Sequence, residues 1–311
     1  IYEIEHVTSA CATGWNMNSG SYISAFRQTM AQITGQKHSL ALSSCTGAMH
    51  IALNALGLKP GHEVLVPDLA DFAVAASVTY CGAIPVFCDV DPDTLCLSAE
   101  DAARKITPNT RGLIAVHLYG QPCRMTPLME LAAQNGLFVL EDATQGMGSS
   151  YNGRPAGSFG HFAAFSFKGN KSVVAGEGGM LLTSDDLLFD RAARLAAGGR
   201  SPDNPFAYDF IGFNYSISAL QAALGFAQTS RLDDLMAKKK KIHSWYRERL
   251  ADTPGIRLNP LPQDSQPSFL TNLLFIDDQN IQRSKMIMQL HASNILAEPV
   301  YFPISSMPMF K

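Results

Sequence analysis

The chain has 311 residues, 46% of them hydrophobic and 16% charged, and a formal net charge of −3. This near-neutral balance gives no reason to expect nucleic acid or an anionic membrane surface as a partner. No apolar run approaches the roughly 20 residues that span a bilayer, and no signal peptide is recognisable, although the sequence begins at Ile1. The length is sufficient for one large domain and a smaller one.

The six cysteines and eight histidines form no pattern typical of disulfides or metal sites. The cysteines include no CxxC pair and lie mostly in apolar or strand-like surroundings, which favours reduced thiols. The histidines have no HxxxH or similar spacing, so no metal site is expected. A cytoplasmic location is therefore predicted.

Residues 1–18 lack clear periodicity and are predicted to form an N-terminal arm or loop. After this arm, residues 19–250 are expected to form one large α/β domain. Its first helix would be capped by Ser19 or Ser21 and would run toward Thr34.

Short apolar runs then alternate with amphipathic segments, a pattern that predicts strands alternating with helices. It indicates βαβ crossovers and a mostly parallel sheet with helices on both faces. Ser184 is expected to cap the last of these helices. The strands are expected over residues 38–42, 63–67, 85–91, 113–117, 138–140, 162–167 and 180–182. One helix is expected to begin within residues 43–48 and to end at residue 56. The other helices are expected over residues 71–80, 98–105, 125–135 and 185–197.

The rest of the chain is predicted to leave the large domain. Residues 217–250 indicate one long or broken helical region with basic residues on its outer face. Several prolines mark residues 254–267 as a linker or domain crossing. A small α+β domain over residues 251–311 would begin with a strand over 269–276, a helix over 279–293 and a strand-like segment over 295–301.

The segment from Ser43 to Ala48 places small and hydroxylated residues between a predicted strand and a helix. The free amides and the dipole of a helix N-terminus bind anions such as phosphate. An ordinary Ser or Thr helix cap would give the same pattern, so both interpretations stay open on these residues alone. Ligands of parallel sheets gather at the carboxyl ends of strands, where Asp142 and residues 166–171 also fall.

A polar turn with Lys168 and Lys171 follows the buried run 162–167, and a glycine-rich segment, 176–179, comes next. A lysine held against a buried strand end is poorly solvated, which favours its neutral, nucleophilic amine. Such a lysine commonly holds pyridoxal phosphate (PLP) as a Schiff base. Most lysines at strand ends are solvated turn residues, so the turn by itself leaves the choice open.

These motifs, in this order, resemble the DegT/DnrJ/EryC1/StrS aminotransferases, fold-type I PLP enzymes that mostly aminate keto sugars carried on nucleotides. The similarity extends from Gly14 to about Pro303. It implies an α/β PLP-transferase fold with a small C-terminal α+β domain that looks incomplete. The matching segments are residues 44–46, 85–92, 116–120, 141–145, 166–171, 176–179 and 214–223.

The resemblance assigns three residues to the reactive end of the cofactor. Lys171, rather than Lys168, matches the Schiff-base lysine, which also moves a proton during catalysis. Asp142 matches the acid that pairs with the pyridine nitrogen and keeps it protonated. Gln145 would contact the ring or its 3′ oxygen. On the residues alone, Asp142 could instead cap the next helix.

The resemblance also implies how the phosphate of PLP is bound. Thr46, the Gly47 backbone and Ser166 would hold it, with Cys45 beside them. Asn214 matches a residue that reaches the phosphate of the neighbouring subunit, so a homodimer with shared active sites is implied. A turn-forming asparagine is the alternative at this position.

Several positions depart from the pattern of the family. Cys45 stands where glycine is usual. Asp71 aligns with an aromatic residue that stacks on the cofactor, a role that Phe72 could take unless it belongs to the core. Ser216 replaces a cationic residue, and Glu298 replaces an arginine near the expected substrate entrance. These changes put the identity of the substrate in question rather than the type of reaction.

We therefore predict a PLP-dependent aminotransferase of amino-sugar or antibiotic biosynthesis. L-Glutamate or L-glutamine would be the donor, and a nucleotide-linked keto sugar or a cyclitol ketone the acceptor. Elimination or replacement on an amino acid is a second possibility, and a non-enzymatic PLP-binding relative is a third. The intact Lys171, Asp142 and Gln145 argue against the third, because unused buried charges destabilise a protein.

Overall fold

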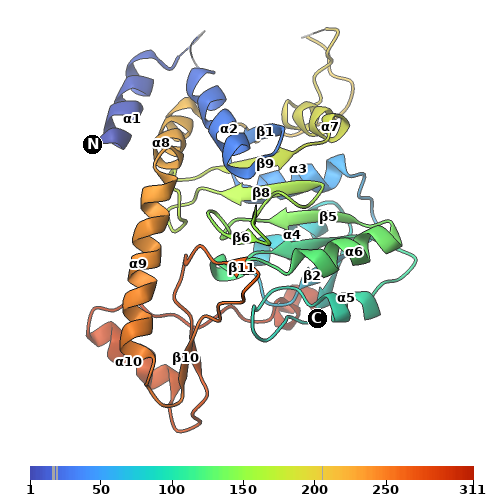
Figure 1. Ribbon diagram of the computed structural model, residues 1–311. Helices are drawn as coiled ribbons and strands as arrows, with labels where there is room; N and C mark the ends of the chain where they lie inside the picture. Colours follow the sequence, from blue (N-terminus) through green and yellow to red (C-terminus); the bar gives the residue numbers. More distant parts are fainter. Residues whose placement is uncertain (16–17, 19, 205) are drawn as a thin grey trace.

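A seven-stranded sheet forms the centre of the computed structural model, which describes residues 1–15, 18, 20–204 and 206–311. Its strand order is β1-β9-β8-β5-β4-β2-β3 (Figure 1). Within this sheet β9 runs against the other strands, so the sheet is mostly parallel, as predicted. The strands are β1 (His38–Leu42), β2 (Glu63–Pro67), β3 (Ile84–Cys88), β4 (Thr110–Val116), β5 (Phe138–Asp142), β8 (Phe162–Ser166) and β9 (Gly179–Thr183).

Helices cover both faces of the sheet, which confirms the predicted α/β class. Successive strand side chains point to opposite faces, so Phe162 of β8 packs in the core with α3 to α7, and Ala163 in the core with α2 and α8. The helices are α2 (Ser21–Thr34), α3 (Cys45–Ala55), α4 (Phe72–Tyr80), α5 (Ala99–Arg104), α6 (Met125–Asn135), α7 (Asp186–Ala196) and α8 (Ala219–Thr229).

The N-terminal arm contains a helix that its sequence pattern did not predict, α1 (Tyr2–Thr13). This helix packs against α8. Beyond the end of α8, the guanidinium of Arg231 donates a 2.6 Å hydrogen bond to the carboxylate of Glu3. The ring of His6 packs edge-on against Phe226. Contacts with a helix distant in sequence, rather than local periodicity, therefore stabilise α1.

Two predicted helix caps differ in the structure. The helix α2 begins at Ser21 after Gly20, so Ser21 is its first residue rather than its cap, and Ser19 lies outside the described residues. The helix α7 begins after Asp185, whose carboxylate accepts two amides of the first turn. The prediction of Ser184 as this cap was therefore wrong, because a charged carboxylate is the stronger acceptor at a helix N-terminus.

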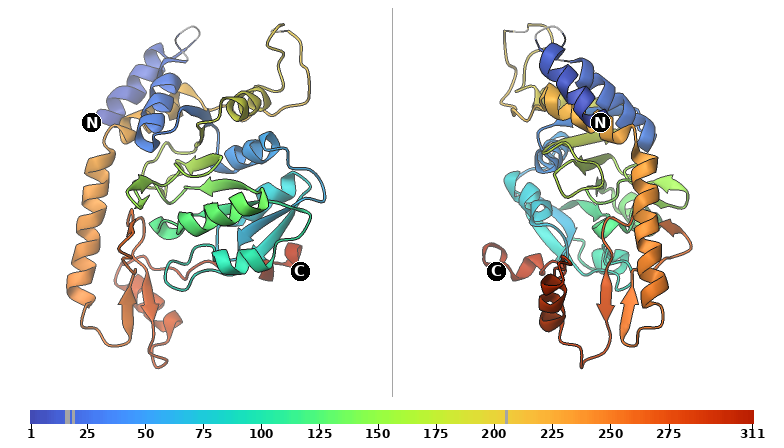
Figure 2. Two further views of the ribbon diagram at one scale, coloured as in Figure 1. Left: turned by 45° about the vertical axis from the view of Figure 1, so that its right-hand side comes forward. Right: turned by 90° about the vertical axis from the view of Figure 1, so that its left-hand side faces the viewer.

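The long helical region is broken after α8, and α9 (Leu232–Leu250) then runs along one side of the molecule, past the large sheet (Figure 2). It leads to β10 (Ile256–Leu258), which pairs with β12 (Leu274–Ile276), and to α10 (Arg283–Ala292). A second small sheet and three 3₁₀ turns complete the described elements: β6 (Ser150–Tyr151), β7 (Arg154–Pro155), β11 (Ser265–Gln266), η2 (Leu118–Gly120), η3 (Ile304–Ser306) and η4 (Pro308–Phe310).

The expected strand over residues 269–276 is present only at its end, as β12. Phe269 has a φ of 52°, which is outside the strand region, and the amide of Leu273 bonds to the side chain of Asn259 instead of a neighbouring strand. Residues 295–301, all of them described, form no strand. The boundary of a small domain at residue 251 stays a prediction.

The last residues of the chain return to the large sheet. Ser305 donates its amide and its hydroxyl to the carboxylate of Asp68, at 2.7 and 2.6 Å. Ile304 is fully buried in the core of the large sheet, and Phe310 packs against Phe87. The C-terminal segment thus closes over the end of β2. In the described part of the chain, no helix has both the length and the apolar character needed to cross a membrane.

The carboxylate of Glu141 ties the end of β5 to the loop before β8. This side chain is fully buried. The Nε2–H of His117 is one of its donors, because Nδ1 of the same ring accepts the amide of Cys123. Every lone-pair direction of the carboxylate is therefore used within the protein. The donors are the amides of Gly157, Phe159 and Gly160, at 2.8, 2.7 and 2.7 Å, and His117 at 3.0 Å.

We expect Glu141→Gln to lower the free energy of unfolding by about 2–4 kcal/mol, because its NH2 group would face donors and leave buried amides unpaired. Urea unfolding measures this change. Glu130→Gln, at an exposed position of α6, is the matched control and should change stability by less than about 0.5 kcal/mol. Equal stability of the two variants would contradict the structural role of Glu141.

Candidate active site

The carboxyl ends of β1, β8 and β5 lie at one edge of the sheet, and the predicted site residues follow these strands. Leu42 at the end of β1 and Ser166 at the end of β8 both pair with Gly179, the first residue of β9. Asp142 ends β5, which is the other neighbour of β8. The structure therefore brings the start of α3, the lysine turn and the acid to one edge, where ligands of such sheets bind.

The N-terminus of α3 has the features of an anion site. Ser44 caps it, and its Oγ accepts the amide of Gly47 at 3.0 Å. A Cβ at Gly47 would lie 3.0 Å from the ring of Tyr215, and one at Gly179 would lie 2.3 Å from the carbonyl oxygen of Ser44. These close approaches require glycine. They gather the amides of the first turn and the half-buried Thr46 in a space that suits a phosphate.

The loop that carries the two lysines is held by backbone hydrogen bonds. The amide of Phe167 bonds to the carbonyl of Gly178 at 3.0 Å, and the amide of Ala175 bonds to the carbonyl of Phe167 at 2.8 Å. Gly178 has a φ of 139°, which side chains disfavour. Within this loop Lys171 is half-buried and Lys168 is exposed. The loop therefore fixes Lys171 next to the end of β8.

The carboxylate of Asp142 is 4% exposed, and its Oδ1 accepts the amide of Thr144 at 3.0 Å. Burial raises the pKa of Asp142, whereas hydrogen bonds from Thr144 and the positive charge of Lys171 lower it in part. The positive charge of Lys171 therefore favours the ionised form of this carboxylate. Asp142 is therefore a buried acid that a cationic partner would stabilise.

Asp142 acts on the thiol of Cys45, and Asp71 acts on Asp142. The thiol of Cys45 is buried and lies 3.1 Å from the hydroxyl of Thr144. Burial, followed by the charge of Asp142, raises the pKa of Cys45 well above its ordinary value. The thiol therefore stays protonated, which disfavours its reaction as a nucleophile. The carboxylate of Asp71 further raises the pKa of Asp142.

Phe72 and Asp71 have different surroundings at the start of α4. The ring of Phe72 is 41% exposed and lies 6.0 Å from the ring of Phe310. Asp71 caps α4 and raises the pKa of both Asp142 and Tyr301. The stacking of Phe72 on a cofactor stays a prediction. The electrostatic influence of this segment on the site comes from Asp71.

Gln145 joins two tyrosines that sequence analysis did not assign to the site. Its Oε1 accepts the amide of Tyr119 at 2.7 Å, and its Nε2 donates to the hydroxyl of Tyr301 at 3.5 Å. The two rings stack with centroids 5.6 Å apart. Burial, followed by the charge of Asp71, raises the pKa of Tyr301 to about 12, so its phenol can donate hydrogen bonds at neutral pH. The Pro-Xaa-Tyr pattern at 299–301 was its signal in the sequence.

Asn214, Ser216 and Glu298 are exposed. Within the described part of the chain, the side chain of Asn214 forms no hydrogen bond, and its backbone pairs with Ala197. Tyr215 contacts the site instead, because its carbonyl accepts the amide of Ser43 at 2.6 Å.

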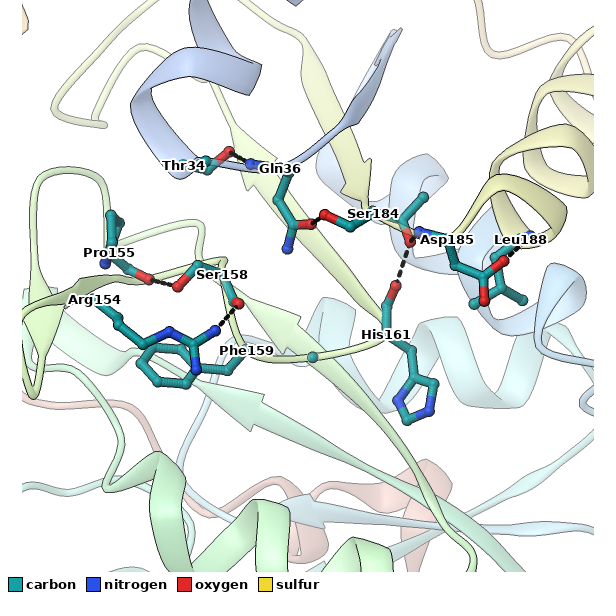
Figure 3. Close-up of a pocket in the computed structure, with 13 residues that line it drawn as sticks. Thr34, Gln36, Arg154, Pro155, Ser158, Phe159, His161, Ser184, Asp185 and Leu188 are labelled. Carbon is teal, nitrogen blue, oxygen red and sulfur yellow. Dashed lines mark hydrogen bonds between the residues drawn. The ribbon is translucent and has the colours of Figure 1, made fainter.

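A cavity of about 570 Å³ lies at the opposite edge of the sheet, beside the start of β8 and the end of β9 (Figure 3). Its polar groups bond to one another. The hydroxyl of Ser184 donates to Gln36, and that of Thr183 donates to the carbonyl of His161. Because the predicted residues lie at the carboxyl edge, this cavity does not contain the candidate site.

The residues at the carboxyl edge fit PLP. A helix N-terminus with closely packed glycines suits its phosphate. The amine of Lys171 suits its aldehyde, and the buried carboxylate of Asp142 suits its pyridine nitrogen. The charge of Lys171 favours the ionised form of Asp142, and both residues follow strands that end at the same edge of the sheet.

Comparison with known proteins gives the same family over nearly the whole chain. The model of the DegT/DnrJ/EryC1/StrS aminotransferase family matches residues 2–311. GDP-perosamine synthase of Caulobacter vibrioides is 37% identical over 314 residues, which cover 99% of this chain and 84% of that relative.

Solved structures agree with this match. DesV of S. venezuelae has a TM-score of 0.91 at 29% identity, covering 99% of this chain and 82% of DesV. DesI, solved in the presence of its TDP-sugar product, also has a TM-score of 0.91 at 29% identity, covering 99% of this chain and 79% of DesI. The chain belongs to the DegT/DnrJ/EryC1/StrS aminotransferase family, and its cofactor is PLP.

Proposed function

We propose that this enzyme transfers an amino group from L-glutamate or L-glutamine to a ketone of a nucleotide-linked sugar. The observation that carries the proposal is that the buried Asp142, the loop of Lys171 and the N-terminus of α3 all follow strands that end at the same edge of the sheet. The relatives support the substrate class, because one is named for GDP-perosamine and another was solved with a TDP-sugar product. These names favour amino transfer over elimination or replacement on an amino acid.

Each site residue has a role in this reaction. PLP supplies the aldehyde that takes up the amino group and the ring that accepts electrons. Lys171 would hold the cofactor, and its Nζ would carry a proton between the Cα of the substrate and C4′ of the cofactor. Asp142 would keep the ring nitrogen protonated. Gln145 would contact the ring, while Thr46, Gly47, Cys45 and Ser166 would surround the phosphate.

We also propose that the active unit is a homodimer with shared sites. The segment between α7 and α8 projects from the body of the protein (Figure 1). Phe206 and Ile211 on it are 92% and 94% exposed, and such apolar side chains favour burial against another surface. Asn214, close to α8 in the chain, would reach the phosphate of the partner's cofactor. We propose the cytoplasm as the site of the reaction, which agrees with six free thiols.

The function is tested by the absorption spectrum of the protein with PLP, before and after L-glutamate. A visible band that glutamate converts to a near-ultraviolet band is expected, followed by its return when a nucleotide-linked keto sugar is added. A stable band that no amino donor changes would contradict amino transfer.

Lys171→Ala should remove the visible band and lower turnover at least about a hundredfold, because no other amine would hold PLP and move the proton. The spectrum and a steady-state assay measure both effects. Lys168→Ala is the matched control in the same loop, and it should keep the band and most of the activity. If only the Lys168 variant lost the band and the activity, the assignment of Lys171 as the Schiff-base lysine would be wrong.

Shared sites predict complementation between two inactive variants. Lys171→Ala and Asn214→Ala each impair every site of their own homodimers. A mixed dimer has one site with both residues intact, so random mixing should restore about a quarter of the normal activity. Coexpression followed by an activity assay measures this recovery. Full activity of Asn214→Ala alone, or no recovery on mixing, would contradict the shared site.

Asp142→Asn should stabilise the cofactor-free protein at neutral pH. The folded-state pKa of Asp142 lies above its unfolded value, so the stability of the unchanged protein falls as the pH rises through that folded pKa. Asparagine removes this loss and can still accept the Thr144 amide. The melting temperature should rise by about 1–3 °C near pH 7.5, and the difference should vanish below about pH 4.

Asp142→Ala is the control for this effect, since it leaves the Thr144 amide unpaired and should lower the melting temperature at every pH. Both variants should lose most of their amino transfer. A melting temperature of Asp142→Asn below that of the unchanged protein near pH 7.5 would contradict the cost assigned to the buried charge.

A further inference from the structure

The turn after β4 connects two parts of the site that are far apart in the chain. This turn is η2, and its middle residue, Tyr119, has a φ of 55° and a ψ of 18°. Such a left-handed conformation is unfavourable for a residue with a side chain, and it persists only where surrounding contacts fix it. For Tyr119 these contacts are made by its backbone amide, its ring and its hydroxyl.

The backbone amide of Tyr119 fixes the side chain of Gln145. It donates to Oε1 at 2.7 Å, and Gln145 is 6% exposed. The backbone of Gln145 is held as well, because its carbonyl accepts the hydroxyl of Ser268 at 3.1 Å. Since a backbone amide can only donate, Gln145 presents its oxygen to Tyr119 and its NH2 group to Tyr301.

The hydroxyl of Tyr119 fixes the C-terminal segment where it passes the site. Its Oη accepts the amide of Tyr301 at 2.9 Å, and the two rings stack with an interplanar angle of 15°. Among residues 296–303, this amide is the only one with a hydrogen bond to the described part of the chain. Pro299 and Pro303 have no amide to donate. One hydrogen bond therefore sets the position of this segment.

The fixed groups suit a sugar. Tyr301 is half-buried, whereas Val300 and Phe302 on either side are exposed. Burial, followed by the charge of Asp71, raises the pKa of Tyr301 to about 12, so the phenol keeps its proton at neutral pH. The Nε2 of Gln145 lies 3.5 Å from this phenol. An N–H and an O–H donor therefore lie together, and the hydroxyl and ketone oxygens of a sugar can accept from both.

We propose that Tyr119 is a positioning residue for the sugar acceptor, which holds Gln145 through its backbone amide and Tyr301 through its hydroxyl. This inference rests on the proposed function, because it takes a nucleotide-linked keto sugar as the acceptor. Tyr119 touches no reacting atom in this scheme. The acceptor is larger than the amino donor and extends further over the C-terminal segment, so loss of the Tyr119 hydroxyl should weaken the binding of the acceptor more.

Tyr119→Phe tests the anchoring, because it removes the acceptor of the Tyr301 amide and keeps the stacked ring and the amide that holds Gln145. Hydrogen exchange is measured by mass spectrometry on the full chain, with and without PLP. The one protected amide of residues 296–303 should exchange roughly tenfold faster, while the buried strand β5 should keep its normal rate. An unchanged rate at residues 296–303 in both states would overturn the inference.

Steady-state kinetics tests the role toward the substrate. In Tyr119→Phe the kcat/KM of the keto sugar should fall roughly tenfold, through a higher KM. The visible PLP band and the kcat/KM of the amino donor should change less than about twofold. Tyr80→Phe, which removes an exposed hydroxyl at the end of α4, is the matched control and should leave every value unchanged. Equal losses for donor and acceptor would overturn the positioning role.

Tyr301→Phe gives a second test that does not depend on how Tyr119→Phe folds. It keeps the amide that Tyr119 holds, so exchange at residues 296–303 should stay normal. It removes the phenol, so the kcat/KM of the keto sugar should still fall. A normal kcat/KM would overturn the positioning role, because the residue that Tyr119 holds would then make no contact with the sugar.

The outcomes separate this inference from the proposed function. If the unchanged protein binds PLP and transfers amino groups, but Tyr119→Phe keeps the kcat/KM of the keto sugar, only the positioning role is overturned. If the unchanged protein forms no visible band with PLP, the proposed function is overturned, and the role of Tyr119 toward a sugar with it.

Discussion

A carboxylate held out of water at the carboxyl edge of the sheet is the constraint on which this site depends. Burying an ionised group costs free energy unless partners replace its hydration. For Asp142 the protein supplies the amide of Thr144 and the charge of Lys171, yet the pKa of the acid remains raised. A protonated ring nitrogen is the kind of partner that completes this compensation.

The sheet topology explains why the acid, the lysine and the anion site meet. Because β9 is antiparallel to both of its neighbours, β1 and β8 end at the same edge, and Gly179 pairs with the last residue of each. The backbone there passes so close that a Cβ on Gly179 would lie 2.3 Å from the carbonyl oxygen of Ser44. One reversed strand therefore fixes the N-terminus of α3 beside the loop that carries Lys171.

The sequence predicts the parts of this arrangement that local pattern determines. Buried strands followed by polar turns placed Lys171 and Asp142 at strand ends, and the structure brings both to one edge. Patterns failed where distant contacts decide the outcome. The helix α1 depends on packing against α8 and on an ion pair with Arg231. The contact between Cys45 and Thr144 joins residues 99 positions apart, which no local pattern predicts.

Two adjacent carboxylates at the end of β5 show how a structural acid differs from a functional one. Side chains of neighbouring strand residues point to opposite faces, so Glu141 and Asp142 lie in different surroundings although both are buried. Three backbone amides and one imidazole donate hydrogen bonds to the carboxylate of Glu141. In the part of the chain that the structure describes, Asp142 has donors from one residue only, Thr144. The fold satisfies the first acid completely and leaves the second with capacity for a ligand.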